Sequence, residues 1–409
     1  MPSQQPVFPS VLDNDLYKFT MQYAVLQHYK DAQVVYQFTN RDKSLQLNAE
    51  AVEWLLKEIQ ELENLRLTEE ERDYIAKLPF FNQEYADYLY NYRYNPSKQV
   101  QVQFNPETLD FDLQVTGLWH ETILYEVPLL SLVSAAYFRY VDRDWDYDGQ
   151  REKAFEKGME LLNNGCTFSE FGTRRRRDFT THDLIMQGLS EAYAKYKQEN
   201  ANPVGVFTGT SNVFLAKKYN VKPIGTVAHE FFMAVSALEN VEHANKITLE
   251  KWLETYKGQL GVALTDTFTT EVFLRDFDHD LASKYAAVRQ DSGDPTEFVQ
   301  RMVDHYKSIN IDPKTKAIVF SDALDVPKAI NLLHTCQKAG INSSFGIGTS
   351  FTNDFRRKSD PNQKSTPMNM VIKMKYCNGK RVIKLSDDAL KHSASDELVN
   401  ELKRRLDIA

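Results

Sequence analysis

The sequence predicts an α/β protein: an irregular TIM-like (β/α) barrel with an additional α+β domain formed from the N-terminal third and the C-terminal tail. Two patterns and the chain length favour this fold class. From about Gly165 onward, short apolar runs alternate with helical patterns. Before that point, helical and strand periods both occur. The 409 residues provide room for two or three folding units.

The composition is that of an ordinary globular protein, with 42% hydrophobic and 26% charged residues. The 49 Lys and Arg residues are outnumbered by 57 Asp and Glu residues, which gives a net charge of −8. Because a general nucleic-acid binder is normally basic, we expect no nucleic-acid partner.

The cysteines and the apolar stretches bear on the cellular compartment. The three cysteines, at positions 166, 336 and 377, form no C-x-x-C pair, which argues against a disulfide framework and a zinc ribbon. Residues 1–10 lack the basic start and apolar centre of a secretory signal, so we expect a cytoplasmic protein. Glu126, Pro128 and two serines interrupt the most apolar stretch, residues 122–138, which predicts buried core and no membrane partner.

The N-terminal third predicts both helices and strands. Between residues 47 and 67, apolar side chains recur at intervals of three and four, the period of a helix with one buried face. Residues 100–104 and 109–115 alternate apolar and polar side chains, which predicts an antiparallel pair joined through residues 105–107. The segment from Asp13 to Lys18 opens a further helix, and capping explains its aspartates.

Seven apolar runs in the later chain each end in a polar cluster. In chain order, the clusters are residues 169–174, 209–212, 225–230, 264–268, 288–294, 320–325 and 345–350. Strands that alternate with helices at this spacing are parallel, and in a (β/α) barrel their carboxyl ends open onto one face. We therefore expect the clusters to converge on one pocket.

These patterns divide the chain into two domains. Residues 1–125 together with 355–409 form the predicted α+β outer domain, and residues 126–354 form the barrel, which is the catalytic domain. Residues 356–367 have no apolar side chain other than two prolines, which predicts an exposed link. The tail then predicts two strands, at 370–374 and 382–385, and a polar terminal helix.

An arginine-rich motif, Glu170-Phe-Gly-Thr-Arg-Arg-Arg-Arg177, follows the first predicted barrel strand. Four adjacent arginines are most often a solvated charge run or a localisation signal. The position at a strand end favours binding, because guanidinium groups match carboxylates and phosphates and the ring of Phe171 can stack on a planar heterocycle. Consecutive side chains cannot all face a pocket, so we expect one or two arginines to contact ligand.

Two aspartates follow neighbouring predicted strands. Asp291-Ser-Gly-Asp-Pro295, which comes after Arg289, is sufficiently explained as the cap of a helix that begins near Pro295. The same position suits an anion, and Asp291 could hold Mg²⁺, directly or through water. Ser321-Asp322 has the same two interpretations, so Asp291 and Asp322 together predict a magnesium pyrophosphate site.

A glycine-rich turn and one histidine complete the candidate site. The turn Gly346-Ile-Gly348-Thr349 could hold a phosphate on its backbone N–H groups, although the pattern is common. No P-loop motif occurs, so any use of a nucleoside triphosphate follows another route. A lone histidine such as His229 is more often structural than catalytic, but an imidazole oriented by a carboxylate can attack phosphorus, and Asp266 is a candidate for that carboxylate.

Taken together, the motifs resemble those of the nicotinate phosphoribosyltransferase family nearly from end to end. The resemblance rests, in family order, on residues 12–18, 170–176, 209–212, 225–230, 289–295, 320–322 and 345–349. It implies an enzyme of NAD salvage that joins nicotinate to 5-phosphoribosyl 1-pyrophosphate, releasing pyrophosphate and nicotinate mononucleotide. It also implies Mg²⁺ as cofactor and ATP as co-substrate, with ATP hydrolysis coupled through a phosphorylated histidine.

The resemblance also implies residue roles. His229 matches the phosphorylated histidine and Asp266 matches the carboxylate that orients it. Phe171 and Arg174 match the ring and the guanidinium that hold the pyridine. Further positions match groups that bind ribose, magnesium pyrophosphate and the 5-phosphate or close the site: Tyr17, Lys18, Arg289, Asp291, Asp322, Gly346, Gly348 and Thr349. A second subunit contributes the closing segment in some relatives, so a monomer and a homodimer both remain open.

Ser211 bears on the choice of substrate. It stands where relatives that use nicotinamide carry an acidic residue able to accept a hydrogen bond from the amide. A carboxylate at this position would repel nicotinate, so the neutral hydroxyl favours the acid.

Three other functions remain open from the sequence. A quinolinate phosphoribosyltransferase uses a related barrel but releases CO₂ from a diacid. A sugar-phosphate aldolase or isomerase shares the barrel, although a Schiff-base aldolase needs a lysine at a strand end and the seven clusters contain none. A binding scaffold with a degenerate site would bind nucleotides without turning them over.

Overall fold

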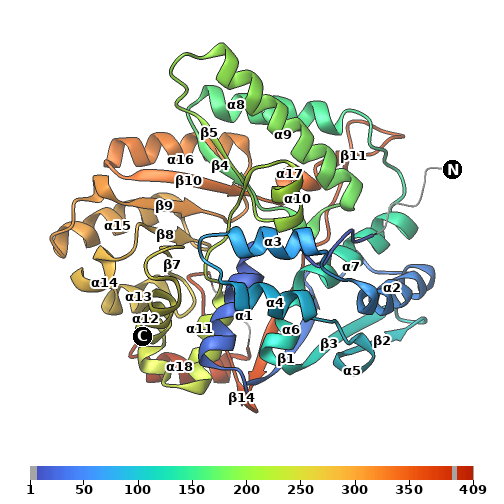
Figure 1. Cartoon of the computed structure of the whole chain (residues 1–409), viewed down its shortest axis with the longest axis horizontal. Coiled ribbons are helices and arrows are strands. Elements are labelled where there is room, and N and C mark those ends of the chain that lie inside the picture. The colour runs from blue at the N-terminus through green and yellow to red at the C-terminus, as the bar shows by residue number, and fades with distance from the viewer. Residues whose placement is uncertain (1–6, 389–393, 409) are drawn as a thin grey trace.

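The computed structural model describes residues 7–388 and 394–408. Of the residues on which the expectation about a secretory signal rests, 1–6 lie outside this range. Within it, the strands form a seven-stranded sheet, a five-stranded sheet and a two-stranded hairpin (Figure 1).

The seven-stranded sheet carries the polar clusters. Its strands are β4 (Thr167–Glu170), β5 (Val206–Thr210), β6 (Lys222–Pro223), β7 (Val262–Leu264), β8 (Ala287–Gln290), β9 (Ala317–Phe320) and β10 (Asn342–Ile347). Every neighbouring pair is parallel, as predicted, and each predicted cluster lies at or just after the carboxyl end of one strand. The pairing order β6-β5-β4-β10-β9-β8-β7 follows the chain around the sheet. The sheet is curled. Because β6 and β7 are its two edges among the described strands, it stays open.

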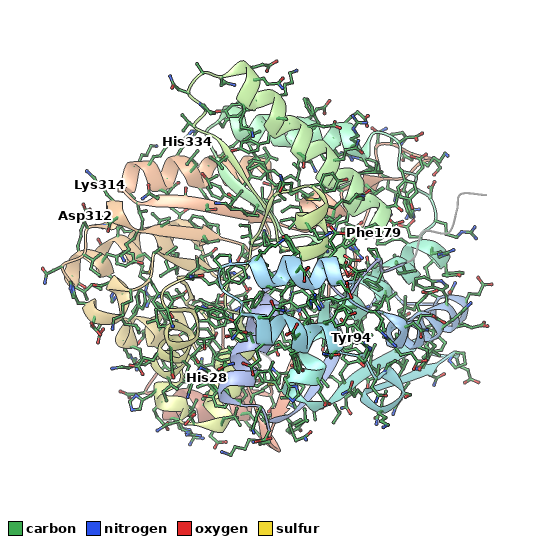
Figure 2. The ribbon with its side chains drawn as sticks, viewed as in Figure 1. His28, Tyr94, Phe179, Asp312, Lys314 and His334 are labelled. Carbon is green, nitrogen blue, oxygen red and sulfur yellow. The ribbon has the colours of Figure 1, made fainter. Side chains whose placement is uncertain are left out.

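Helices lie before, between and after the parallel strands in the chain. They are α8 (Gln150–Asn163), α9 (Phe179–Glu199), α10 (Val213–Lys218), α11 (His229–Leu238), α12 (Ala244–Tyr256), α13 (Thr270–Asp276), α14 (His279–Ser283), α15 (Pro295–Ser308), α16 (Val326–Ala339) and α17 (Thr349–Thr352). Figure 1 shows α15 and α16 along one flank of the sheet and α8 with α9 at its top. The exposed residues Asp312, Lys314 and His334 project from that flank (Figure 2).

The five-stranded sheet joins the two ends of the chain. It contains β1 (Gln33–Asn40), β2 (Val100–Asn105), β3 (Asp110–Leu118), β13 (Met370–Cys377) and β14 (Lys380–Arg381) in the antiparallel order β14-β13-β1-β3-β2. The predicted pair at 100–115 is confirmed, with Val100 opposite Val115, and the predicted strand at 370–374 lies within β13, where Ile372 faces Phe38. The predicted strand at 382–385 is wrong, because these buried residues leave the ladder after Arg381.

The helices of the N-terminal third pack around this sheet. They are α1 (Leu16–His28), α2 (Ala49–Glu61), α3 (Glu69–Lys77), α4 (Gln83–Asn91), α5 (Pro96–Gln99), α6 (Trp119–Thr122) and α7 (Glu126–Tyr140), with 3-10 turns at Leu62–Asn64 and Ile123–Tyr125. The predicted helix at 47–67 is α2, whose cap Asn48 accepts from the Ala51 N–H. The apolar stretch at 122–138 is buried core, and no helix among the described residues is long and apolar enough to cross a membrane.

The predicted exposed link at 356–367 is partly ordered. Strands β11 (Phe355–Arg356) and β12 (Lys364–Ser365) pair as a hairpin, and the terminal helix is α18 (Asp396–Arg405). The buried Arg177 anchors the hairpin: its guanidinium carbon lies 3.6 Å from the ring centroid of Phe138 and 3.9 Å from that of Phe355. It also donates to Ser365 Oγ at 3.0 Å. The composition of residues 356–367, from which an exposed link was predicted, gives no sign of this contact with Arg177.

Candidate active site

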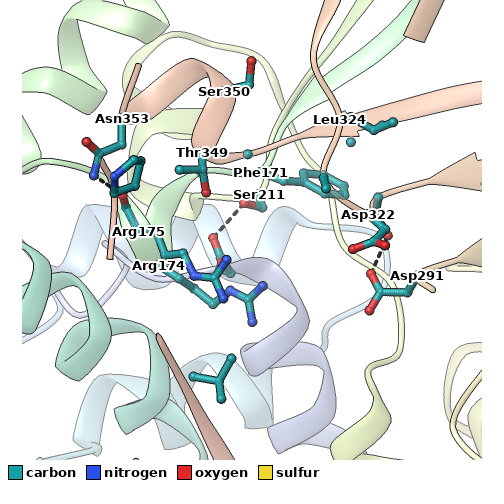
Figure 3. Close-up of a pocket in the computed structure, with 18 of the residues that line it drawn as sticks. Phe171, Arg174, Arg175, Ser211, Asp291, Asp322, Leu324, Thr349, Ser350 and Asn353 are labelled. Carbon is teal, nitrogen blue, oxygen red and sulfur yellow. Dashed lines mark hydrogen bonds between the residues drawn. The ribbon is translucent and has the colours of Figure 1, made fainter. Parts of the chain in front are cut away.

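A cavity of about 1060 Å³ opens where the parallel strands end. Most of the predicted site residues line it: Tyr17, Phe171, Arg174, Ser211, His229, Arg289, Asp291, Asp322, Gly346, Gly348 and Thr349. In the view of Figure 3, Arg174 and Arg175 lie on one side of Phe171, and Asp291 and Asp322 lie on the other. The polar clusters therefore converge as the strand pattern predicts.

His229 is the first residue of α11, and both of its ring nitrogens have partners. Nδ1 lies 2.9 Å from Thr267 Oγ1, and Nε2 lies 3.0 Å from Asp291 Oδ2. Asp266 is farther away, with Oδ1 3.7 Å from Nε2, and it does not line the cavity. Burial and the nearby charge of Lys384 lower the pKa of His229, which favours the neutral imidazole that a nucleophile needs.

Lys384 belongs to this cluster, and the sequence patterns missed it. Its Nζ lies 2.9 Å from His229 Nε2 and 3.0 Å from Asp266 Oδ2. Although burial raises the pKa of Asp266, the charges of His229 and Lys384 outweigh burial and lower it. Residues 382–385 have the composition of a short, mainly apolar strand, so no local signal marks this lysine as a cavity residue.

Three of these side chains also have the chemistry of a metal site. Ligand atoms of His229, Asp266 and Asp291 lie within 4.8 Å of one another. The ammonium group of Lys384 lies against the same atoms and opposes a second cation there. Lys384 therefore makes this cluster a poorer site for Mg²⁺ than its two carboxylates alone would be.

Asp291 has hydrogen-bond partners besides His229. Its Oδ1 accepts from Arg289 Nη2 at 2.9 Å and from Ser321 Oγ at 2.7 Å. Although burial raises the pKa of Asp291, Arg289 and His229 keep it well below its usual range. Since direct coordination of Mg²⁺ by Asp291 would disturb these bonds, a contact through water fits better. Asp322, on the cavity wall, is the second carboxylate.

The glycine turn lies directly against Phe171. A Cβ atom at Gly346 would lie 2.3 Å from the Phe171 ring, and one at Gly348 would lie 2.9 Å from the Phe171 carbonyl oxygen. Both positions therefore have to lack a side chain for the ring to lie where it does. Thr349 begins α17 beside this turn and faces the cavity.

The four arginines separate into two pairs. Arg174 and Arg175 line the cavity, and Arg175 donates to the carbonyl of β13 at Met370. Arg176 is buried and donates two hydrogen bonds to Asp13, at 2.7 and 2.6 Å. With Arg177 anchoring the hairpin, two of the four arginines face the cavity, and their contact with a ligand stays a prediction.

Ser211 has an acidic neighbour that the sequence argument did not consider. Its hydroxyl donates to Asp15 Oδ1 at 2.7 Å, and Asp15 also lines the cavity. Burial raises the pKa of Asp15, which favours its neutral form. A negative charge on Asp15 is therefore less favourable than on a solvated aspartate, which weakens its repulsion of an acid at Ser211.

Lys18 lies behind the cavity wall. Its side chain is fully buried between Glu126 and Glu230, both of which line the cavity. Tyr17, the adjacent residue, faces the cavity of its own chain. Glu126 lies outside the motifs singled out in the sequence, and Glu230 ends the 225–230 cluster but was given no role there.

The fold and the cavity define an α/β protein with a polar, charged site at the carboxyl ends of parallel strands, the place where enzymes with this kind of sheet have their active sites. Residues 166–409 match the Nicotinate phosphoribosyltransferase (NAPRTase) family, and residues 12–134 match the NAPRTase N-terminal domain. The chain belongs to the nicotinate phosphoribosyltransferase family.

Individual relatives are similar to this chain over nearly its whole length. The "Probable nicotinate phosphoribosyltransferase" of Schizosaccharomyces pombe is 46% identical over 98% of both chains. The nicotinate phosphoribosyltransferase of Saccharomyces cerevisiae is 44% identical over 98% of this chain and 96% of its own. The crystal structure of a proposed nicotinate phosphoribosyltransferase from Saccharomyces cerevisiae covers 99% of this chain and 100% of its own, at 42% identity and a TM-score of 0.94.

Proposed function

We propose that this chain is a nicotinate phosphoribosyltransferase of NAD salvage, which forms nicotinate mononucleotide and pyrophosphate from nicotinate and 5-phosphoribosyl 1-pyrophosphate. Family membership over nearly the whole chain supports the proposal. The observation that carries it is the cavity, where an aromatic ring, a pair of arginines and a pair of aspartates face one space.

The substrates fit these groups chemically. The face of Phe171 suits the pyridine ring, and Arg174 suits its carboxylate. The ring nitrogen attacks the anomeric carbon as the bond to the pyrophosphate oxygen breaks, and no base is needed because this nitrogen carries no proton. Arg289 and the turn from Gly346 to Thr349 suit the sugar and the 5-phosphate. Catalysis therefore comes from positioning and charge stabilisation.

Mg²⁺ is the proposed cofactor, with Asp322 and, through water, Asp291 as its ligands. When bound, it would supply positive charge to the pyrophosphate.

ATP coupling is part of the same proposal. Transfer of the γ-phosphoryl group from ATP to a ring nitrogen of His229 would release ADP, and hydrolysis would later return the imidazole and phosphate. The cluster of His229, Asp266 and Lys384 supports this step, because a cation beside the ring can pair with the phosphoryl oxygens. Phosphorylation would favour the closed state that holds the donor, and dephosphorylation would reopen it.

The finer structural expectations belong to this proposal too. They are an irregular (β/α) barrel over residues 126–354, an outer domain of residues 1–125 and 355–409, and a cytoplasmic location. The open parallel sheet in barrel order and the pairing of β13 with β1 support the two-domain division.

A substrate panel tests the proposal. The protein is incubated with 5-phosphoribosyl 1-pyrophosphate, Mg²⁺ and either nicotinate, nicotinamide or quinolinate, and mononucleotide and CO₂ are measured. We expect mononucleotide from nicotinate without CO₂. Release of CO₂ from quinolinate at a comparable rate would favour the decarboxylating enzyme, and binding without product would favour a scaffold.

A further inference from the structure

Lys18 joins two acidic residues that lie far apart in the sequence. Its Nζ lies 2.5 Å from Glu126 Oε2 and 2.5 Å from Glu230 Oε2, and its side chain is 0% exposed. The three residues come from α1, α7 and α11. Both carboxylates line the cavity, whereas the lysine does not.

Glu126 connects this buried cluster to the proposed carboxylate site. Its Oε1 lies 3.4 Å from Arg174 Nη1, and its Oε2 accepts a hydrogen bond from the Tyr17 hydroxyl at 3.2 Å. Arg174 is the more exposed partner, with 41% of its side chain accessible. Glu126 and a bound ligand carboxylate would therefore compete for the same guanidinium group.

Glu230 has further donors, and Glu126 depends more on cations. Tyr36 and the Trp119 indole N–H both donate to Glu230 Oε1, the latter at 2.7 Å. Although burial raises the pKa of Glu126, Lys18 and Arg174 outweigh it and hold that pKa below its usual value. Glu126 is thus an ionised, buried group whose charge Lys18 and Arg174 together balance.

The charge balance shows what Lys18 contributes. With Lys18 present, two cations face two carboxylates, so a ligand carboxylate can take over Arg174 without leaving Glu126 unpaired. Without Lys18, Arg174 would have to remain on Glu126, since an uncompensated buried charge is costly. Glu126 would then repel an anionic ligand instead of tolerating it.

We propose that Lys18 is a positioning residue for substrate selection: by holding Glu126, it leaves Arg174 available to the carboxylate of an aromatic acid and so favours the acid over its neutral amide. This inference rests on the proposed function. It assigns to Lys18 an indirect role, which differs from the ligand contact that the sequence resemblance implies.

The test compares binding of nicotinate and nicotinamide, by calorimetry and by competition, in the full-length protein. In Lys18→Met, the dissociation constant for nicotinate should rise about tenfold or more, and that for nicotinamide should change much less. In the double variant Lys18→Met/Glu126→Gln, the unpaired carboxylate is gone, so most of the preference for the acid should return. Glu126→Gln alone should keep that preference.

A matched control separates this role from a loss of folding. Lys316→Met removes another buried lysine, whose Nζ donates only to backbone carbonyls such as those of Ala282 and Tyr285. It should lower thermal stability without changing the preference for nicotinate. If the Lys18 single variant fails to fold, the double variant still decides, because a lost acid preference there would overturn the inference.

The two hypotheses fail in different ways. If the unaltered protein does not bind or convert nicotinate, the proposed function is wrong. If it does, and Lys18→Met weakens both ligands equally or the double variant restores nothing, only the role of Lys18 is wrong.

Discussion

At the scale of single residues, Phe171 shows how a neighbouring glycine shapes the cavity. Because a Cβ atom at Gly346 would lie 2.3 Å from the ring, Gly346→Ala must displace Phe171. We expect the KM for nicotinate to rise about tenfold, the equivalent of losing an aromatic contact worth roughly 1.5 kcal/mol. Steady-state kinetics measure this change. Gly261→Ala, remote from the cavity lining, is the control, and an unchanged KM in Gly346→Ala would refute the stacking role.

Glu170 gives a pH prediction at the same scale. It is fully buried and accepts from His182 Nε2 at 2.7 Å and from Thr210 Oγ1 at 2.6 Å. Although burial raises the pKa of Glu170, His182 and these hydrogen bonds outweigh it and lower the pKa from 4.5. A carboxyl group with a lowered folded-state pKa stabilises the protein above its unfolded-state pKa, and this stabilisation is lost as the pH falls below about 4.5.

The variant Glu170→Gln tests that sign. It should lower the free energy of unfolding at pH 7 by about 1–3 kcal/mol, because buried donors lose their charged acceptor. Its stability should also fall less steeply than that of the parent as the pH drops through 4.5. Thermal melts across this pH range measure both effects, and parallel acid profiles for the two proteins would contradict the assignment.

Single residues also mark the limit of prediction from sequence. Phe171, Arg174 and Asp291 were found because they stand in motifs at strand ends, where a local pattern carries spatial information. Lys384 and Glu126 belong to no such pattern, and their positions follow from how distant segments pack. Lys18 was found, but its burial between two carboxylates depends on α7 and α11, which no property of its own segment predicts.

At the scale of elements, the motif of residues 291–295 at the start of α15 contains one aspartate that caps the helix and another that faces the cavity. Asp294 caps the helix by accepting from the N–H groups of Thr296 and Glu297, as the structural interpretation of the motif requires. Asp291, three residues earlier, faces the cavity and contacts His229. The two interpretations of the motif therefore apply to different aspartates.

Paired substitutions test this division. Asp294→Ala should cost about 1 kcal/mol of stability through the lost cap and leave nicotinate turnover nearly unchanged. Asp291→Asn should lower kcat on the order of 100-fold, and it should also cost about 1–3 kcal/mol of stability, because Arg289 and Ser321 lose their charged acceptor. Melting curves and turnover rates measure the two, and equal losses of turnover would show that the motif acts as one unit.

Helices and strands could be predicted from the sequence where a single hydrophobic period dominated the segment. The parallel strands, the helix α2 and the pair β2–β3 follow from local patterning, because burial on one or both faces dictates the residue types. The run at 382–385 is apolar like a strand, but it lies outside the strands of the described sheets and its side chains are buried. The Val382 N–H still donates to the Lys375 carbonyl of β13 at 3.0 Å. Likewise, a hairpin held by the aromatic cage around Arg177 has no signature in its own composition.

At the scale of the whole molecule, the structure bears on the open question of a monomer or a homodimer. The segment that the resemblance links to closing the site is the start of the chain's own α1, where the Leu16 N–H donates to the Ser211 carbonyl at 2.7 Å. Tyr17 therefore faces its own cavity. We predict that specific activity stays constant when the protein is diluted, even if an oligomer dissociates. Turnover assays measure the activity, and light scattering measures the oligomeric state at each concentration. A loss of activity that tracks dissociation would show that a second subunit completes the site.

Acidic and basic side chains both line the cavity, and we propose that it couples ATP to nucleotide synthesis through His229. The most direct measurement follows nicotinate mononucleotide and ADP together, with and without ATP, for the parent protein and His229→Ala. We predict that ATP raises turnover in the parent and yields ADP with the product, and that the variant keeps only the ATP-independent rate. Full ATP-stimulated turnover in His229→Ala, or no stimulation in the parent, would contradict it.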